Sequence, residues 1–137
     1  MYILAFSILI LCLNGFIHGL ILSNSSFIFN KFISLNEKPL SSFAISVFMT
    51  LSIFIAMIAH FSGIAIWAVL LFALSVFPDL STAFYFSIVA YTTLGFGDIT
   101  LPEPWRITSG IMAANGFLMF GWSTAFQIDL LTELRRR

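Results

Sequence analysis

Charge is scarce in this sequence of 137 residues: only 9% of them are charged, whereas about 25% is usual for a soluble domain. Residues 1–30 contain no Asp, Glu, Lys or Arg, and between Pro39 and Pro78 the only titratable side chain is His60. Hydrophobic residues make up 60% of the chain. Because a soluble fold of this length cannot bury so much apolar surface, we predict an integral membrane protein in contact with lipid.

Further features that the sequence lacks exclude several classes of function. The net charge is zero and the only basic run is residues 135–137, so nucleic acid is not expected as a partner. No Ser/His/Asp set, HExxH motif or Cys/His cluster is present, so we expect neither an enzyme nor a cofactor. Cys12 is the single cysteine, which excludes an intrachain disulfide and predicts a small buried hydrophobic residue.

The first apolar run covers residues 1–22, about 33 Å as a helix, which is enough to cross a bilayer. It lacks the basic start of a signal peptide, so we predict a retained N-terminal transmembrane helix. Residues 23–42 follow as a polar connector, and together they form an N-terminal region over 1–42.

One asparagine and two histidines lie within the first two apolar runs. Asn14 and His18 lie four residues apart on one helix face, where they either line a polar seam or pair with a neighbouring helix; we favour pairing. His60 is a candidate pH sensor because its charge changes near neutral pH. We favour instead a polar residue at a kink, hydrogen-bonded to a partner.

The second apolar run, residues 43–77, measures about 52 Å as one helix. That length allows either a hairpin or one crossing with a bend near Gly63 and its second half packed at the outer membrane surface. One crossing places Lys31, Lys38 and the arginines of 135–137 on the cytoplasmic side, with the N-terminus outside. We therefore favour one crossing.

The next segment has the pattern of a re-entrant helix. Asp79 favours a helix start, and the helix expected over 79–92 is too short to span a membrane. A glycine-containing turn over 93–98 follows, and such backbone lies at membrane depth only where protein or a water-filled pore satisfies it. A last helix over 105–128, about 36 Å long, is expected to return across the membrane.

The turn over 93–98 has the features of an ion-binding segment. A cation crossing lipid must exchange its hydration shell for several oxygen dipoles, and backbone carbonyls supply them without a trapping charge. Aiming successive carbonyls at one axis requires dihedral angles that glycine adopts readily, which explains Gly95 and Gly97. The Thr93 hydroxyl adds a ligand, and the negative end of the preceding helix favours a cation below.

Residues 84–99, Phe-Tyr-Phe-Ser-Ile-Val-Ala-Tyr-Thr-Thr-Leu-Gly-Phe-Gly-Asp-Ile, resemble the pore helix and filter of the potassium-channel superfamily. Residues 77–127 are similar to the pore domain of the small bacterial two-helix channels. The resemblance implies an all-α pore domain over 43–137, made of an outer helix, a re-entrant pore helix, a filter loop and an inner helix. It further implies a homotetramer of identical subunits, multi-pass in the bacterial inner membrane.

The resemblance also implies the roles of individual residues. Potassium is held by the carbonyls of four residues and by the hydroxyl of the first: Thr93, Leu94, Gly95 and Phe96. Gly97 completes the filter, Thr92 precedes it, and Asp98 lies at the outer mouth.

Three positions depart from the family pattern. Leu94 stands where many members carry Val or Ile, and Phe96 stands where many carry Tyr. Some relatives have, at the position of Val89, a Glu that pairs with the residue matched by Asp98. Tyr85 is the candidate substitute donor to Asp98.

The last helix carries one further pattern. Five residues recur at intervals of three or four and share a face: Met112, Asn115, Met119, Ser123 and Gln127. This face either lines a water-filled cavity below the filter or packs against another helix, and we favour the cavity. Gly116 is the candidate gating hinge, with helix packing as its alternative.

The sequence therefore predicts a subunit of a passive potassium-selective channel, with potassium ions in the filter. The alternatives are a weakly selective cation channel and a non-conducting membrane interaction protein with a relic pore loop. No helix has the spaced arginines of a voltage sensor. Tension, lipid and a separate regulatory subunit stay open as the source of gating, as does a constitutively open pore.

Overall fold

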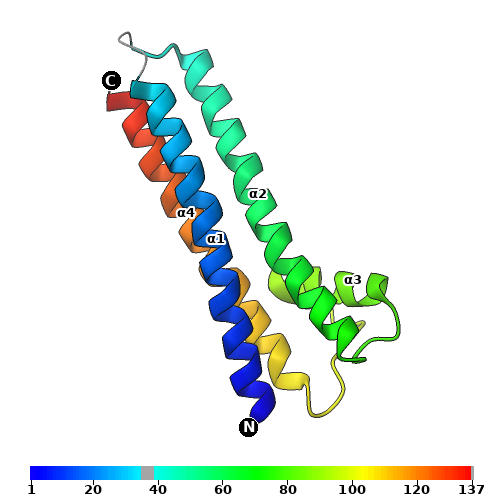
Figure 1. Ribbon diagram of the computed structural model, residues 1–137. Helices are drawn as coiled ribbons and strands as arrows, with labels where there is room; N and C mark the ends of the chain where they lie inside the picture. Colours follow the sequence, from blue (N-terminus) through cyan, green and yellow to red (C-terminus); the bar gives the residue numbers. More distant parts are fainter. Residues whose placement is uncertain (35–38, 137) are drawn as a thin grey trace.

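The chain folds into four helices and, in the part that the structure describes, no strand. The computed structural model describes residues 1–34 and 39–136; its helices are α1 (Tyr2–Ser34), α2 (Ser42–Ala73), α3 (Leu80–Tyr91) and α4 (Arg106–Arg136). Figure 1 shows the three long helices side by side, with the short α3 against them at one end. The all-α fold predicted from the sequence is confirmed.

Helix α1 is longer than predicted. The boundary expected at residue 22 is wrong, because the helix continues to Ser34 through the polar stretch assigned to the connector. The hydroxyl of Ser25 donates a 2.8 Å hydrogen bond to the carbonyl of Leu22, so this buried polar group has its partner within the helix itself. Phe29 and Ile33 pack on α4, which stabilises the last turns. Glu37 and Lys38 lie outside the described residues.

Helix α2 makes one continuous pass. It begins after Ser41, whose side chain accepts a 3.2 Å hydrogen bond from the backbone N–H of Ala44. It runs without interruption through Gly63, and Figure 1 shows it nearly straight, so the expected bend and surface-packed second half are wrong. It ends earlier than residue 77, because Ser75 has a φ of 56° and closes the helix with a left-handed cap.

Helix α4 runs parallel to α1. Near their starts the hydroxyls of Ser7 and Thr108 lie 3.1 Å apart, and near their ends Phe29 and Ile33 pack on α4. Helix α4 extends to Arg136, so its predicted end at residue 128 is wrong. The N-terminus thus lies at the α3 end of the molecule, and the C-terminus lies beside the end of α1 and the start of α2 (Figure 1).

Two of the described helices have the length and apolarity of membrane spans. Helices α1 and α2 have mean hydropathies of 2.1 and 2.2 and expose large apolar side chains such as Phe16 and Phe54. Helix α4 has 31 residues but mixes polar side chains among its apolar ones. Cys12 is exposed on α1, so its predicted burial is wrong, and its thiol lies on the apolar outer surface of the helix.

Candidate functional site

The site starts from the short helix α3. Its N-cap is Asp79, whose carboxylate accepts 2.8 Å hydrogen bonds from the backbone N–H and the hydroxyl of Thr82. These bonds hold the pKa of Asp79 below its usual value. Helix α3 ends at Tyr91 with Thr92 as its C-cap. Its carbonyl end, which carries partial negative charge, therefore faces the loop formed by residues 92–98, here named the 92–98 loop.

Every second residue of this loop has a left-handed backbone. The φ angles are 61° at Thr93, 58° at Gly95 and 78° at Gly97. Glycine adopts such angles readily, whereas a β-branched residue does so under strain of about 1–3 kcal/mol. The glycine angles fit the reason given for these residues, and the strained angle at Thr93 was not foreseen.

The loop turns its N–H groups back to α3. The N–H groups of Leu94 and Gly95 donate to the carbonyl of Val89 over 3.0 and 3.3 Å, and that of Thr93 donates to the carbonyl of Ala90 over 3.0 Å. Within the described chain, no backbone hydrogen bond ends on a carbonyl of residues 92–98. The first half of the loop thus has its N–H groups bonded to α3, and the loop carbonyl oxygens stay available.

Tyr85 and Asp98 meet at the outer end of the loop. The phenol of Tyr85 donates a 2.7 Å hydrogen bond to a carboxylate oxygen of Asp98. This is the contact expected from Tyr85 as the substitute donor. Val89 contributes no side-chain polar group, and its carbonyl is the acceptor that holds the loop instead.

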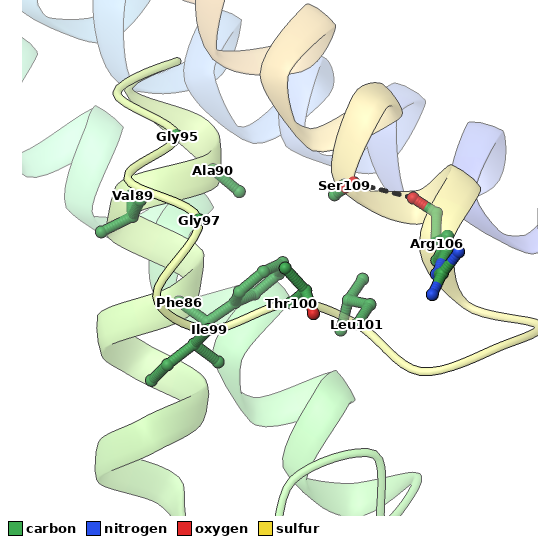
Figure 2. A pocket seen from close by; sticks show the side chains of 10 residues that line it. All are labelled: Phe86, Val89, Ala90, Gly95, Gly97, Ile99, Thr100, Leu101, Arg106 and Ser109. Atoms are coloured by element: carbon green, nitrogen blue, oxygen red, sulfur yellow. Dashed lines mark hydrogen bonds between the residues drawn. The ribbon is translucent and has the colours of Figure 1, made fainter.

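A cavity of about 340 Å³ lies behind the loop. Figure 2 shows the loop running back along α3, with Arg106 and Ser109 of α4 across from it. The wall includes Gly95, Gly97 and the apolar side chain of Val89. On the α3 side, the wall is therefore apolar at Val89, whereas Thr100, Arg106 and Ser109 contribute polar groups.

A single chain leaves the loop uncovered. Residues 93–98 are all exposed, and the side chains of Leu94 and Phe96 are 56% and 65% accessible. Large apolar groups beside unpaired carbonyls require a covering partner at membrane depth. In the single chain the loop is therefore open to its surroundings.

The predicted cavity-lining face is wrong. The side chains assigned to it are buried inside the subunit, with accessibilities of 0% for Met112 and Asn115, 6% for Met119 and 5% for Ser123. Helical spacing shows which residues share a face but not which way that face points. Among the exposed residues of α4, one stripe recurs at intervals of three or four: Gly110, Ala114, Phe117, Gly121, Thr124 and Ile128.

Gly116 lies where α4 touches the end of α3. A Cβ atom there would collide with the carbonyl oxygen of Tyr91, so only glycine permits this approach. Helix α4 is continuous through this position. The structure gives Gly116 a packing role, and its role as a hinge stays a prediction.

Polar side chains of α1, α2 and α4 form a buried polar seam, defined here as Asn14, His18, His60, Trp67, Asn115 and Ser123. The side-chain amide of Asn14 donates to the Oδ1 of Asn115 over 2.8 Å, and the indole N–H of Trp67 donates to the same oxygen over 3.0 Å. The pairing favoured for Asn14 and His18 is thus present. The sequence signal for it was the recurrence of polar residues on the facing side of α4.

Comparison with known proteins identifies the family. A family model described as an ion channel matches residues 55–133, which is more than half of the chain. The matched segment holds the second half of α2, all of α3, the 92–98 loop and most of α4, and it leaves out α1. No curated protein and no solved structure matches the chain. The chain has the pore-domain fold of this family with an additional N-terminal helix, and it belongs to the ion channel family.

Proposed function

We propose that four copies of this chain form a pore that conducts potassium selectively and passively across a membrane. The observation that carries the proposal is the 92–98 loop, in which left-handed residues alternate and the carbonyls accept no backbone hydrogen bond. Those carbonyls replace the hydration shell of the ion, and the partial negative charge at the end of α3 favours a cation beneath them.

Each subunit supplies only a few oxygen ligands for the ion. The carbonyls of Thr93, Leu94, Gly95 and Phe96 and the hydroxyl of Thr93 supply one oxygen per level of the filter. A single oxygen per level cannot replace a hydration shell, so several copies must surround one axis. The exposed Leu94 and Phe96 are then covered by neighbouring subunits. A closed ring of four identical chains satisfies both requirements.

The pore continues below the filter along the exposed stripe of α4. Phe117 and Thr124 are accessible members of that stripe, and they are the side chains that we assign to the cavity wall. This stripe replaces the buried face that includes Asn115. The cavity is then lined by one polar hydroxyl and by apolar groups, which suits a cation that is not trapped on its way.

The bacterial inner membrane is the location that we assign, with three crossings by α1, α2 and α4. Lys31 at the end of α1 and the arginines at the end of α4 share one end of the molecule, and the 92–98 loop lies toward the other. The positive-inside rule places the basic end in the cytoplasm and the N-terminus outside.

Ion flux into liposomes tests the proposal. The purified protein is reconstituted, and potassium and sodium flux are measured with and without barium. We expect potassium flux that barium blocks and sodium that is excluded. Absence of flux in both salts would contradict the proposal and favour a non-conducting membrane interaction protein.

A weakly selective cation pore is the second candidate. It is favoured by the apolar wall behind the loop, where Val89 offers no carboxylate, and by the exposed position of the Tyr85–Asp98 hydrogen bond. A less rigid filter discriminates less between potassium and sodium. Equal flux of the two ions, both stopped by barium, would select this candidate.

A further inference from the structure

A chain of hydrogen bonds crosses the interior of the subunit from α1 to the end of α3. The Nε2 atom of His18 on α1 lies 2.9 Å from the hydroxyl of Ser123 on α4. That hydroxyl lies 3.2 Å from Nε2 of His60 on α2, whose Nδ1 lies 3.3 Å from the phenol oxygen of Tyr91 on α3. These four residues, here named the histidine relay, join all four helices.

The histidine relay is shielded from solvent and lipid. Its four side chains are between 0% and 7% accessible. The two imidazole rings lie with their centroids 4.9 Å apart, and the ring of Phe120 stacks on His60 at 4.2 Å. No Asp, Glu, Lys or Arg occurs in α2 or α3, and those of α1 and α4 lie near the helix ends. The hydrogen bonds are therefore the main polar interactions of these rings.

The protons of the histidine relay can be arranged in one consistent direction. The phenol of Tyr91 donates to Nδ1 of His60, the Nε2–H of His60 donates to Ser123, and the Ser123 hydroxyl donates to Nε2 of His18. In the opposite direction His18 donates first and Tyr91 accepts last, which leaves the phenol proton of Tyr91 without an acceptor among the residues that the structure describes, so the first direction satisfies more groups. In both cases the tautomer of one histidine dictates that of the other, so a change at His18 is transmitted to Tyr91.

Tyr91 is fixed at both ends. A Cβ atom on Gly63 of α2 would lie 3.3 Å from its phenol oxygen, and one on Gly116 of α4 would collide with its carbonyl. The residue directly precedes Thr92 and Thr93, so its position determines where the inner end of the filter begins. Small shifts of this residue are passed to the loop through the backbone.

Helix α1 lies outside the segment that matches the ion channel family, yet it contributes His18. We propose that His18, Ser123 and His60 are positioning residues that hold Tyr91 in place. Through His18, α1 contributes to ion selectivity in addition to anchoring the chain in the membrane. The proposal rests on the proposed function of residues 93–97 as the filter.

The test measures the ratio of potassium to sodium flux in liposomes for three variants and the parent. Tyr91→Phe removes only the phenol oxygen, and His18→Leu removes the far end of the histidine relay. Ser7→Ala is the matched control, because it removes a buried α1–α4 hydrogen bond that does not reach Tyr91. We expect the first two variants to lower the ratio at least about fivefold, the lower range of coupling between sites. The control should keep it.

The double variant His18→Leu with Tyr91→Phe distinguishes a relay from two separate effects. Because both changes break the same chain, the double variant should have the ratio of the more affected single variant. A product of the two single effects, or an unchanged ratio in either single variant, would overturn the inference. If His18→Leu fails to fold, Ser123→Ala breaks the middle of the chain and should couple to Tyr91→Phe in the same way.

The parent protein separates this inference from the proposed function. Selective potassium flux in the parent with no change in the variants overturns the histidine relay alone. Absence of selective flux in the parent overturns the proposed function and the inference together. His18→Gln keeps a hydrogen-bond donor and an acceptor in its side-chain amide. It should therefore retain part of the parent ratio, whereas a role of His18 in packing alone would predict no such rescue.

Discussion

The 92–98 loop and the buried polar seam are two polar regions within one apolar subunit, and they treat their polar atoms in opposite ways. The loop is exposed; the N–H groups of Thr93, Leu94 and Gly95 donate to α3, and within the described chain the loop carbonyls have no backbone partners. The seam is buried, and Asn14, Asn115 and Trp67 meet in direct hydrogen bonds. The exposed carbonyls of the loop are open to a partner from outside the chain, whereas the paired atoms of the seam fix the helices to each other.

The difference has a physical cause in the cost of an unpaired polar group away from water, about 1–3 kcal/mol in proteins. The seam avoids most of that cost within one chain through its direct hydrogen bonds, although Oδ1 of Asn14 and Nδ2 of Asn115 have no hydrogen-bond partner among the described residues. Under the proposed function, the loop avoids it when ions, water and neighbouring subunits occupy the space in front of it. Changes in the loop should therefore affect conduction, and changes at Asn14, Trp67 and Asn115 of the seam should affect stability.

The largest effect on conduction is expected from Gly95→Ala. A Cβ atom at this position has open space around it, so the substitution tests the backbone angle of 58° alone. An L-residue in this conformation costs about 1–2 kcal/mol, and the cost recurs in every subunit of the ring. We expect loss of potassium flux in liposomes, with the helical content retained by circular dichroism.

Gly15→Ala is the control for this change. It lies in α1, where the added methyl group makes an ordinary 3.9 Å contact with Met119. We expect unchanged flux and a helix about 0.5–1 kcal/mol more stable. Normal conduction in Gly95→Ala would show that the 92–98 loop does not shape the pore.

Asn115→Leu should produce the largest change in the seam. The substitution leaves the indole N–H of Trp67 and the amide of Asn14 without their shared acceptor. We expect a loss of about 1–2 kcal/mol in the free energy of unfolding, measured by thermal unfolding in detergent.

The exposed substitution Asn30→Ala provides the comparison, because its only hydrogen bond is a long one to Ser26. It should leave the melting temperature unchanged. Replacing Asn14 by Leu in the Asn115→Leu background should recover part of the loss, since one orphaned donor is removed. A stability equal to that of the parent in Asn115→Leu would contradict the structural role of the seam.

The smallest effect is expected from Tyr85→Phe. It removes the exposed hydrogen bond to Asp98 and keeps the ring in place. We expect conduction to continue with a reduced ratio of potassium to sodium permeability, because the outer end of the filter becomes less rigid. Recordings of the parent and the variant in the same lipid would check this, and an increased ratio would argue against Tyr85 as filter support.

The sequence carried enough information to predict the loop and the helices around it. The short helix after Asp79, the glycine pair and the apolar flanks are local patterns, and the structure has α3 over Leu80–Tyr91 with Asp79 as its cap. The contact of Tyr85 with Asp98 was also expected, because a missing carboxylate at Val89 calls for another donor.

The orientation of α4 and the helix ends were not predictable in the same way. The spacing of Asn115 and Ser123 defined a face, but only the packing of α1 against α4 showed that this face is buried. The stretch after residue 22 is polar in composition, and its helix is stabilised by Phe29 and Ile33 through contacts with a segment about a hundred residues away. Such non-local contacts override local composition.

The most direct test of the central claim is the reversal potential of the reconstituted pore in a planar bilayer, with potassium on one side and sodium on the other. We predict a reversal potential displaced far from zero, with the sign of a potassium-selective pore, and a barium block of the current. A reversal potential near zero would contradict the assignment of residues 93–97 as a potassium filter.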